Sequence, residues 1–136
     1  MFELDYAKDY ILQDKNVILS PLKKEHVQHL LEISNDKSIW TYFLENGYGQ
    51  HGLNNYVNKA IQNRKKKIEY PFVIFDKVKN SYAGTTRLYE YNADIRTIKL
   101  GHTWIGKSFQ GTGLNKHCKY LLFEFAFENL INKRIV

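Results

Sequence analysis

The segment from Gln110 to Asn115, with the sequence QGTGLN, has the residue types of an anion-binding turn. It follows an apolar segment typical of a strand and precedes a segment whose apolar residues have helical spacing. The first N–H groups of a helix have no partner within that helix and point towards one place. Because Gly111 and Gly113 have no Cβ, a phosphate could approach the main chain there. A simple tight turn is the alternative that these residues leave open.

The turn differs from two common nucleotide-binding loops. A nucleoside-triphosphate loop ends in Gly-Lys-Ser/Thr, and this ending is absent after Gly113. The dinucleotide fingerprint needs a third glycine, which the Gly-Thr-Gly sequence lacks at the required spacing. Neither class of nucleotide site is therefore predicted.

The elements around the turn are typical of an α+β protein. Their expected order is β-α-α-β-β-β-α-(β), with the three central strands forming an antiparallel meander. Strands are expected at 16–22, 70–75, 82–91 and 98–105, with one more opening at 132–136, and helices at 26–35, at 52–67 and from 114 onwards. Ser20 and Pro21 would suit the start of the first helix.

The strand expected at 98–105 would place successive side chains on alternate faces of the sheet. One face would then carry Ile98, Leu100, His102 and Trp104, and the other Lys99, Gly101 and Thr103. His102 would point into the same core as its apolar neighbours. Cys118 lies on the apolar face of the next helix, where we expect a small core residue and not a reactive thiolate.

The composition predicts one soluble domain over residues 1–136. Apolar residues make up 43% of the chain, but their runs are too short to span a membrane. The single cysteine can form no internal disulfide and the N-terminus does not resemble a secretory signal, so a cytoplasmic location is expected. The net charge of +6 favours an anionic partner. The basic run at 64–67 is interpreted as a solvated helix end, and a nucleic-acid partner is not favoured.

Gln110 to Asn115, taken with the strand before them, resemble the Gln/Arg-x-x-Gly-x-Gly/Ala coenzyme A motif of the GNAT N-acetyltransferases. The similarity extends to VILSPLKKEHVQHLLEI, which resembles the first strand and helix of the family, and to AGTTRLYEY, which resembles its third strand. The branch that the chain is most similar to is that of the ribosomal-protein N-terminal acetyltransferases. Asn115 departs from the motif, which usually has Gly or Ala at that position.

The resemblance implies acetyl-CoA as the cosubstrate, without a metal. The amides expected to hold its pyrophosphate are those of Gln110, Gly111, Thr112, Gly113, Leu114 and Asn115. The main chain at Trp104 and Ile105 would bind the pantetheine arm, and Lys107 and Lys116 flank the turn. The implied reaction is direct attack of a primary amine on the thioester. The acceptor would be a small-molecule or peptide amine, such as a protein N-terminus.

Two residues are candidates for the general base of this reaction. Relatives often have Glu just before the Leu/Ile-Gly pair of this strand, but Lys99 occupies that place. His102 is the nearest replacement, because its unperturbed pKa of about 6.5 suits this role. Glu90, on the preceding strand, is the second candidate. A structural His102 within the core is the alternative.

Similar proteins continue through a fifth strand, another helix and two more strands, so the resemblance implies a domain that is incomplete at its C-terminus. The tyrosine that usually protonates the leaving thiolate would lie in that region. An unpaired sheet edge would also favour a homodimer. Two other classes stay open: a CoA-binding or structural remnant without turnover, and a basic RNA- or ribosome-binding module, although no strand alternates basic and aromatic residues.

Overall fold

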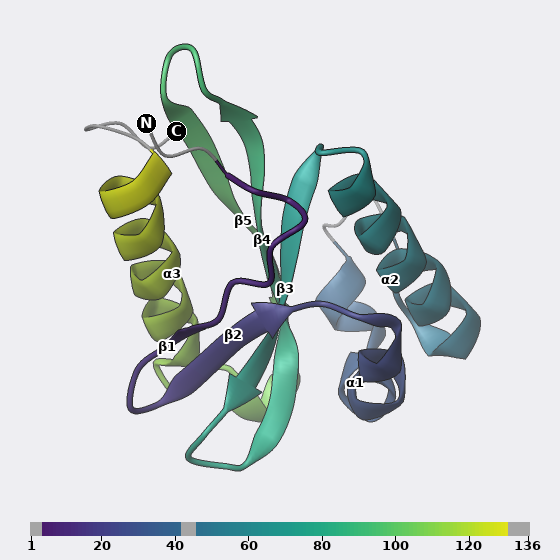
Figure 1. The fold of residues 1–136 in the computed structure, drawn as a ribbon. Helices are drawn as coiled ribbons and strands as arrows, with labels where there is room; N and C mark the ends of the chain where they lie inside the picture. The colour runs from purple at the N-terminus through teal and green to yellow at the C-terminus, as the bar shows by residue number, and fades with distance from the viewer. Residues whose placement is uncertain (1–3, 42–45, 131–136) are drawn as a thin grey trace.

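One antiparallel sheet organises the part of the chain that the computed structural model describes, residues 4–41 and 46–130. Its strands are β1 (Leu12–Gln13), β2 (Val17–Pro21), β3 (Glu69–Asp76), β4 (Ser81–Asn92) and β5 (Thr97–Ile105). They lie side by side in chain order, as a meander (Figure 1). The predicted α+β class is confirmed, while the short β1 was not predicted. The strand expected at 132–136 lies outside the described residues.

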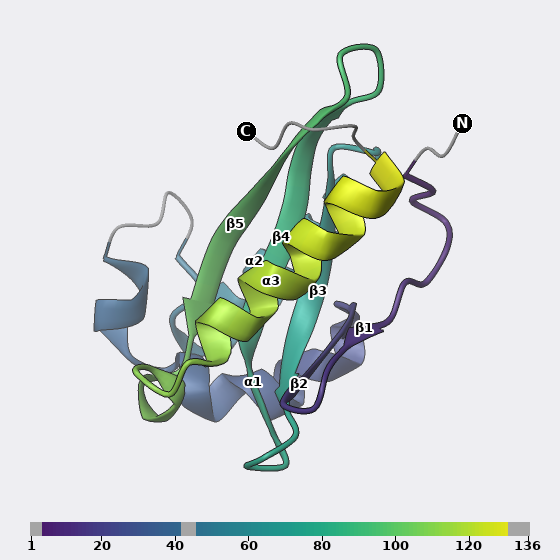
Figure 2. The same cartoon turned by 90° about the vertical axis from the view of Figure 1, so that its left-hand side faces the viewer.

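Helices cover both faces of the sheet. The α-helices are α1 (Val27–Ser34), α2 (Gly49–Lys65) and α3 (Leu114–Phe125). Short turns of 3-10 helix lie at Lys24–His26, Lys37–Trp40 and Lys107–Phe109, and one π-helical turn lies at Ala126–Leu130. Figure 1 shows α1 and α2 on one face and α3 on the other, and Figure 2 shows α3 lying obliquely across the sheet. No helix within the described residues is both long and apolar enough to cross a membrane.

The predicted start of the first helix at Ser20 and Pro21 is wrong, because both residues belong to β2. Pro21 is the last residue of that strand and lies opposite Phe72 of β3. A proline at a strand end leaves little of the ladder unpaired. The chain turns into helix only after Lys23, whose backbone N–H donates to Nδ1 of His26 at 2.9 Å.

The sheet separates two hydrophobic cores, and β3 contributes to both. Tyr70, Phe72 and Ile74 belong to the core under α3, and Val73 belongs to the core under α1 and α2. All four side chains are fully buried. The continuous apolar run of this strand therefore reflects a sheet that is covered on both faces.

A bulge in β5 interrupts the alternation that the sequence predicts. Trp104 lies opposite Thr85, but Gly101 lies opposite Arg87, so β5 has one more residue than β4 in this interval. His102, within the bulge, has a left-handed φ of 47° and is exposed. Ile98 and Leu100 pack into the α3 core, whereas Trp104 joins the core of α1 and α2. The prediction that all four residues share one face is therefore wrong.

The end of β5 approaches β4 closely at Gly84. Gly84 lies opposite Ile105, and a Cβ built on Gly84 would be 2.0 Å from the carbonyl oxygen of Trp104. Only glycine allows this approach. Immediately after the strand, the N–H of Gly106 donates to the carbonyl of Ala83 at 2.9 Å. These contacts fix the place where the chain leaves the sheet towards α3.

A buried ion pair joins the sheet to α2. Nη1 of Arg87 contacts both carboxylate oxygens of Glu69, at 2.8 and 2.7 Å, and Nη2 donates to the hydroxyl of Tyr56 at 2.5 Å. The side-chain amide of Asn63 donates to the same carboxylate at 3.0 Å. The Arg87 and Glu69 side chains are only 7% and 8% exposed. Burying both charges is costly, so removing either one would leave the other buried without a compensating charge.

Replacing Glu69 with Ala should lower the free energy of unfolding by about 3–5 kcal/mol, because it removes the carboxylate from a buried guanidinium. The double variant Glu69→Leu/Arg87→Met removes both charges and should recover most of that loss. Urea denaturation of the three proteins measures the effect. A loss under about 1 kcal/mol for Glu69→Ala would show that the pair contributes no more than a surface ion pair.

Candidate functional site

The turn between β5 and α3 is built on two glycines with left-handed backbones. Gly111 has a φ of 74°, and Gly113, the N-cap residue of α3, has a φ of 86°. Residues with a Cβ adopt these angles at a cost of about 1–2 kcal/mol each. No atom lies within 4 Å of a Cβ built on either glycine. The backbone conformation therefore favours glycine, and the space beside both residues is open.

Several N–H groups of this turn lack an acceptor in the described part of the chain. The N–H of Gln110 donates to the carbonyl of Lys107 at 3.2 Å, and that of Leu114 to the Thr112 hydroxyl at 3.4 Å. The N–H groups without an acceptor there are those of Gly111, Thr112, Gly113 and Asn115. They lie where the positive end of the α3 dipole is expected. The turn thus offers a group of free donors to an anion.

Side chains hold the turn in this shape. The Thr112 hydroxyl donates to the carbonyl of Phe109 at 2.7 Å, and Nε2 of Gln110 donates to the carbonyl of Ile105 at 2.9 Å. Phe109 is buried in the core under α3. One turn further along α3, Nδ1 of His117 lies 2.9 Å from Oδ2 of Asp14. The donors are therefore positioned before a ligand arrives.

The turn borders a cleft of about 470 Å³. Its lining residues are Thr103, Ile105, Phe109, Gln110, Gly111, Gly113, Asn115 and Lys116. Lys116 is exposed and can contribute a positive charge, while Nζ of Lys107 lies 3.4 Å from Oδ2 of Asp36. Cleft volumes of this order accommodate small molecules. Of the two flanking lysines, Lys116 is therefore the one that faces this cleft.

The main-chain carbonyls of Trp104 and Ile105, at the end of β5, point in different directions. The Trp104 carbonyl is directed towards β4, as its closeness to Gly84 shows. The Ile105 carbonyl accepts from Gln110 and, by the alternation of an antiparallel ladder, lies on the edge away from β4. Ile105 also lines the cleft. It is therefore better placed than Trp104 for the predicted main-chain contact with a ligand, and the role of both stays a prediction.

The structure places His102 outside the core, so the alternative of a buried structural histidine is wrong. Its ring packs edge-on against Tyr89, with the ring centroids 4.4 Å apart. Tyr89 and Arg87 lie on the same face of β4 by alternation, and Arg87 contacts α2. His102 therefore lies on the face of the sheet opposite α3. Its role as a base stays a prediction.

Glu90 also has a left-handed backbone, with a φ of 50°, and its carboxylate lies 2.6 Å from Nζ of Lys99. The hydrogen bond that the Lys99 ammonium donates to Glu90 raises the pKa of Lys99 above its ordinary value. The pair is exposed to solvent, and neither residue lines the cleft. Glu90 therefore serves as an ion-pair partner here, and its role as a base is untested.

Cys118 lies on the buried face of α3, as predicted. Burial raises the pKa of its thiol to about 12. The thiol stays protonated at neutral pH, so it cannot act as a nucleophile.

Sequence reasoning missed two residues of the cleft, Thr103 and Phe109. The hydroxyl of Thr103 lies 2.7 Å from that of Thr86 on β4, and both residues lie within the bulge. Gly101 was the available signal, because a glycine within a strand often marks a bulge. Phe109 had no comparable signal, since its position depends on the 3-10 turn between β5 and the glycines.

The fold resembles that of solved acetyltransferases. A GCN5-related N-acetyltransferase from Brucella melitensis is 18% identical, with a TM-score of 0.84 over 99% of this chain and 62% of that chain. An acetyltransferase from Salmonella typhimurium, described as modifying the N-terminal serine of ribosomal protein L7/L12, is 20% identical, with a TM-score of 0.72 over 90% of this chain and 71% of that chain. RimL, described as a ribosomal L7/L12 alpha-N-protein acetyltransferase, is 18% identical, with a TM-score of 0.72 over 96% and 73%.

These identities show a shared fold. The chain spans 62% of the length of the Brucella structure. A search of curated proteins found no significant match. The sequence pattern of the acetyltransferase (GNAT) domain matches residues 16–136, which is most of the chain. The glycine turn, the sheet that carries it and this match lead to one conclusion: the chain belongs to the GNAT acetyltransferase family.

Proposed function

We propose that the protein is an acetyl-CoA-dependent N-acetyltransferase whose acceptor is a primary amine. The observation that supports this most directly is the group of free N–H donors between Gly111 and Asn115. They border an open cleft in a chain of the GNAT family. The donors suit a pyrophosphate, because they are neutral, fixed and close to a helix N-terminus. When bound, acetyl-CoA supplies the acetyl group as a thioester.

We assign the residues of the turn different roles in binding acetyl-CoA. The amides of Gly111, Thr112, Gly113 and Asn115 would donate to the pyrophosphate, and Lys116 would add a positive charge. Gln110 and Leu114, whose amides already have acceptors, would position the turn through the Gln110 side chain and the buried Leu114 side chain. Ile105, with Trp104 beside it, would meet the pantetheine arm along the β5 edge.

The acceptor that we propose is an α-amine, such as a protein N-terminus. Deprotonation at pH 7 costs about 1 kcal/mol for an α-amine of pKa about 7.8, and about 4–5 kcal/mol for a lysine amine. A weak base is therefore sufficient for the first. His102 is the base we propose, because it is exposed on the face of the sheet away from α3. An amine that approached from that face would not cross the pyrophosphate turn.

The compartment that we propose is the reducing cytoplasm, since the single cysteine forms no internal disulfide. Self-association also remains a proposal. Phe123 and Phe127 stack on the exposed surface at the end of α3, with ring centroids 5.9 Å apart. Such an exposed apolar surface would provide a contact between two copies.

Gly113→Val should weaken acetyl-CoA binding by about tenfold or more, because a β-branched side chain at the N-cap of α3 blocks close approach of the pyrophosphate. Isothermal calorimetry with acetyl-CoA measures the affinity.

The matched control is Gly49→Val. Gly49 begins α2 with a φ of 78° and, like Gly113, has no atom within 4 Å of a built Cβ. It should therefore lose similar stability while retaining acetyl-CoA affinity. Equal affinity of wild type and Gly113→Val would contradict the assignment of the turn.

His102→Ala should remove one limb of the pH profile of acetyl transfer. A histidine base works when neutral, so the wild-type rate with a short peptide amine should rise as the pH increases through about 6–7. The peptide amine adds a limb near about 7.8, which both proteins should share. Acetyl-CoA affinity of the variant should be unchanged. The same profile in both proteins would exclude His102 as the base.

A further inference from the structure

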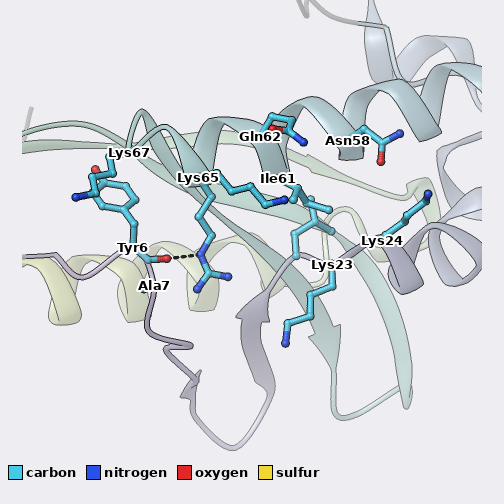
Figure 3. Close-up of a pocket in the computed structure, with 11 residues that line it drawn as sticks. Tyr6, Ala7, Lys23, Lys24, Asn58, Ile61, Gln62, Lys65 and Lys67 are labelled. Carbon is cyan, nitrogen blue, oxygen red and sulfur yellow. Dashed lines mark hydrogen bonds between the residues drawn. The ribbon is translucent and has the colours of Figure 1, made fainter.

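A second cavity lies far from the glycine turn, between α2 and the N-terminal segment. Its volume is about 740 Å³. One wall is α2, with Asn58, Ile61 and Lys65, and Lys23 and Lys24 of the chain after β2 form the other (Figure 3). Tyr6 and Lys67 lie together at one end (Figure 3). We call this cavity the α2 groove.

The α2 groove lies at the opposite end of the sheet from the glycine turn. It borders the C-terminal half of α2, which leads into the first residue of β3, whereas the glycine turn lies beyond Ile105, near the end of β3. The length of β3 separates these two ends by about 23 Å. α2, which lines the groove, and α3, which begins at the glycine turn, cover opposite faces of the sheet (Figure 1). A ligand of the groove would not compete with acetyl-CoA.

Positive charge predominates along the groove. Among the described residues that line it, five are Lys or Arg and none is Asp or Glu. The single carboxylate of Asp9 pairs with two of the five: it lies 3.0 Å from Nζ of Lys23 and 2.9 Å from Nη2 of Arg64. The other three cations are Lys24, Lys65 and Lys67, which have no ion-pair partner in the described part of the chain. They favour an anionic ligand.

Lys67 occupies a position where glycine would be less strained. It follows the C-cap of α2 with a left-handed φ of 61°. Glycine is the usual residue at such a position, because a Cβ is unfavourable there. The chain has a lysine there instead, at the border of the groove. A strained backbone at a residue whose side chain lines a cavity is consistent with a binding role for that residue.

The groove suits a peptide better than a nucleic acid. Asn58 and Gln62 lie one turn apart on α2, and their exposed amides can both donate to and accept from an extended main chain. Ile61 and Leu22 provide apolar contacts. Single-stranded nucleic acids stack their bases on open aromatic faces. Tyr6, the one aromatic residue that the described part of the chain contributes to the lining, packs against the core beside Tyr70.

Arg64, the residue best suited to phosphate, is already engaged. Its Nε donates to the carbonyl of Tyr6 at 2.7 Å, and Nη2 donates to that of Lys8 at 2.9 Å. The remaining lysines act as point charges, which suit separate carboxylates along a chain. We propose that the α2 groove binds an acidic, extended segment of a partner protein. This binding does not depend on acetyl transfer.

The test is fluorescence polarisation with a labelled octapeptide of glutamates, blocked at its N-terminus so that it cannot be an acceptor. The peptide should bind, and its affinity should fall with added salt. Lys24→Glu/Lys65→Glu should weaken binding by about tenfold or more, because like charges would then face each other. The matched control, Lys15→Glu/Lys119→Glu, changes the net charge equally at exposed sites outside the groove. It should weaken binding less than about threefold.

Lys67→Gly separates binding from folding. It should raise Tm by about 2–6 °C, because glycine removes the strain of the left-handed backbone at this position. It should still weaken binding of the glutamate octapeptide, because a lysine charge is lost. Acetyl-CoA affinity should be unchanged in all of these variants, which keeps the result independent of the proposed activity. Three outcomes would overturn the proposal: equal weakening by the control pair, equal binding of a polyglutamine octapeptide, or tighter binding of an oligothymidylate of the same charge.

Discussion

The close approach of β4 to β5 at Gly84 is the constraint on which the arrangement of the cofactor site depends. A side chain at Gly84 would collide with the Trp104 carbonyl, so the two strands could no longer pair through Ile105. Gly106, held by Ala83, could not then start the 3-10 turn that leads to the glycines. The position of the free N–H donors is therefore set by a main-chain contact within the sheet, and not by the turn alone.

The sheet also separates the functions that we assign to its two faces. On one face, the buried Leu114 and Cys118 of α3 and Phe109 of the preceding 3-10 turn hold the donor turn against the sheet. On the other face the Arg87–Glu69 pair fixes α2 against β3 and β4. This position determines where the α2 groove meets the N-terminal segment. Because the bulge at His102 lies between the two regions, a single local irregularity places the proposed base on the face away from the cofactor turn.

The periodicity of the sequence was sufficient for α2, the helix predicted at 52–67. Its buried residues have the spacing of one helix face: Leu53, Tyr56, Val57 and Ala60. It was also sufficient for the central strands, because their apolar runs are bounded by clear turns. It failed to predict which face of β5 each side chain occupies. A bulge depends on pairing with β4, and its only signal in the sequence is Gly101. The basic run at 64–67 ends α2 with exposed lysines, as predicted. The α2 groove itself could not be predicted, because Lys23 and Lys24, which also line it, come from a distant part of the sequence.

The central claim is that the free amides of the glycine turn bind the pyrophosphate of acetyl-CoA. Backbone amide NMR of the ¹⁵N-labelled protein, titrated with coenzyme A, tests it residue by residue. The account predicts large, saturable shifts for the amides of Gly111, Gly113 and Asn115, with the amides of Lys24 and Lys65 in the α2 groove unchanged. Saturable binding of coenzyme A that left the amides of the glycine turn unshifted would contradict the account.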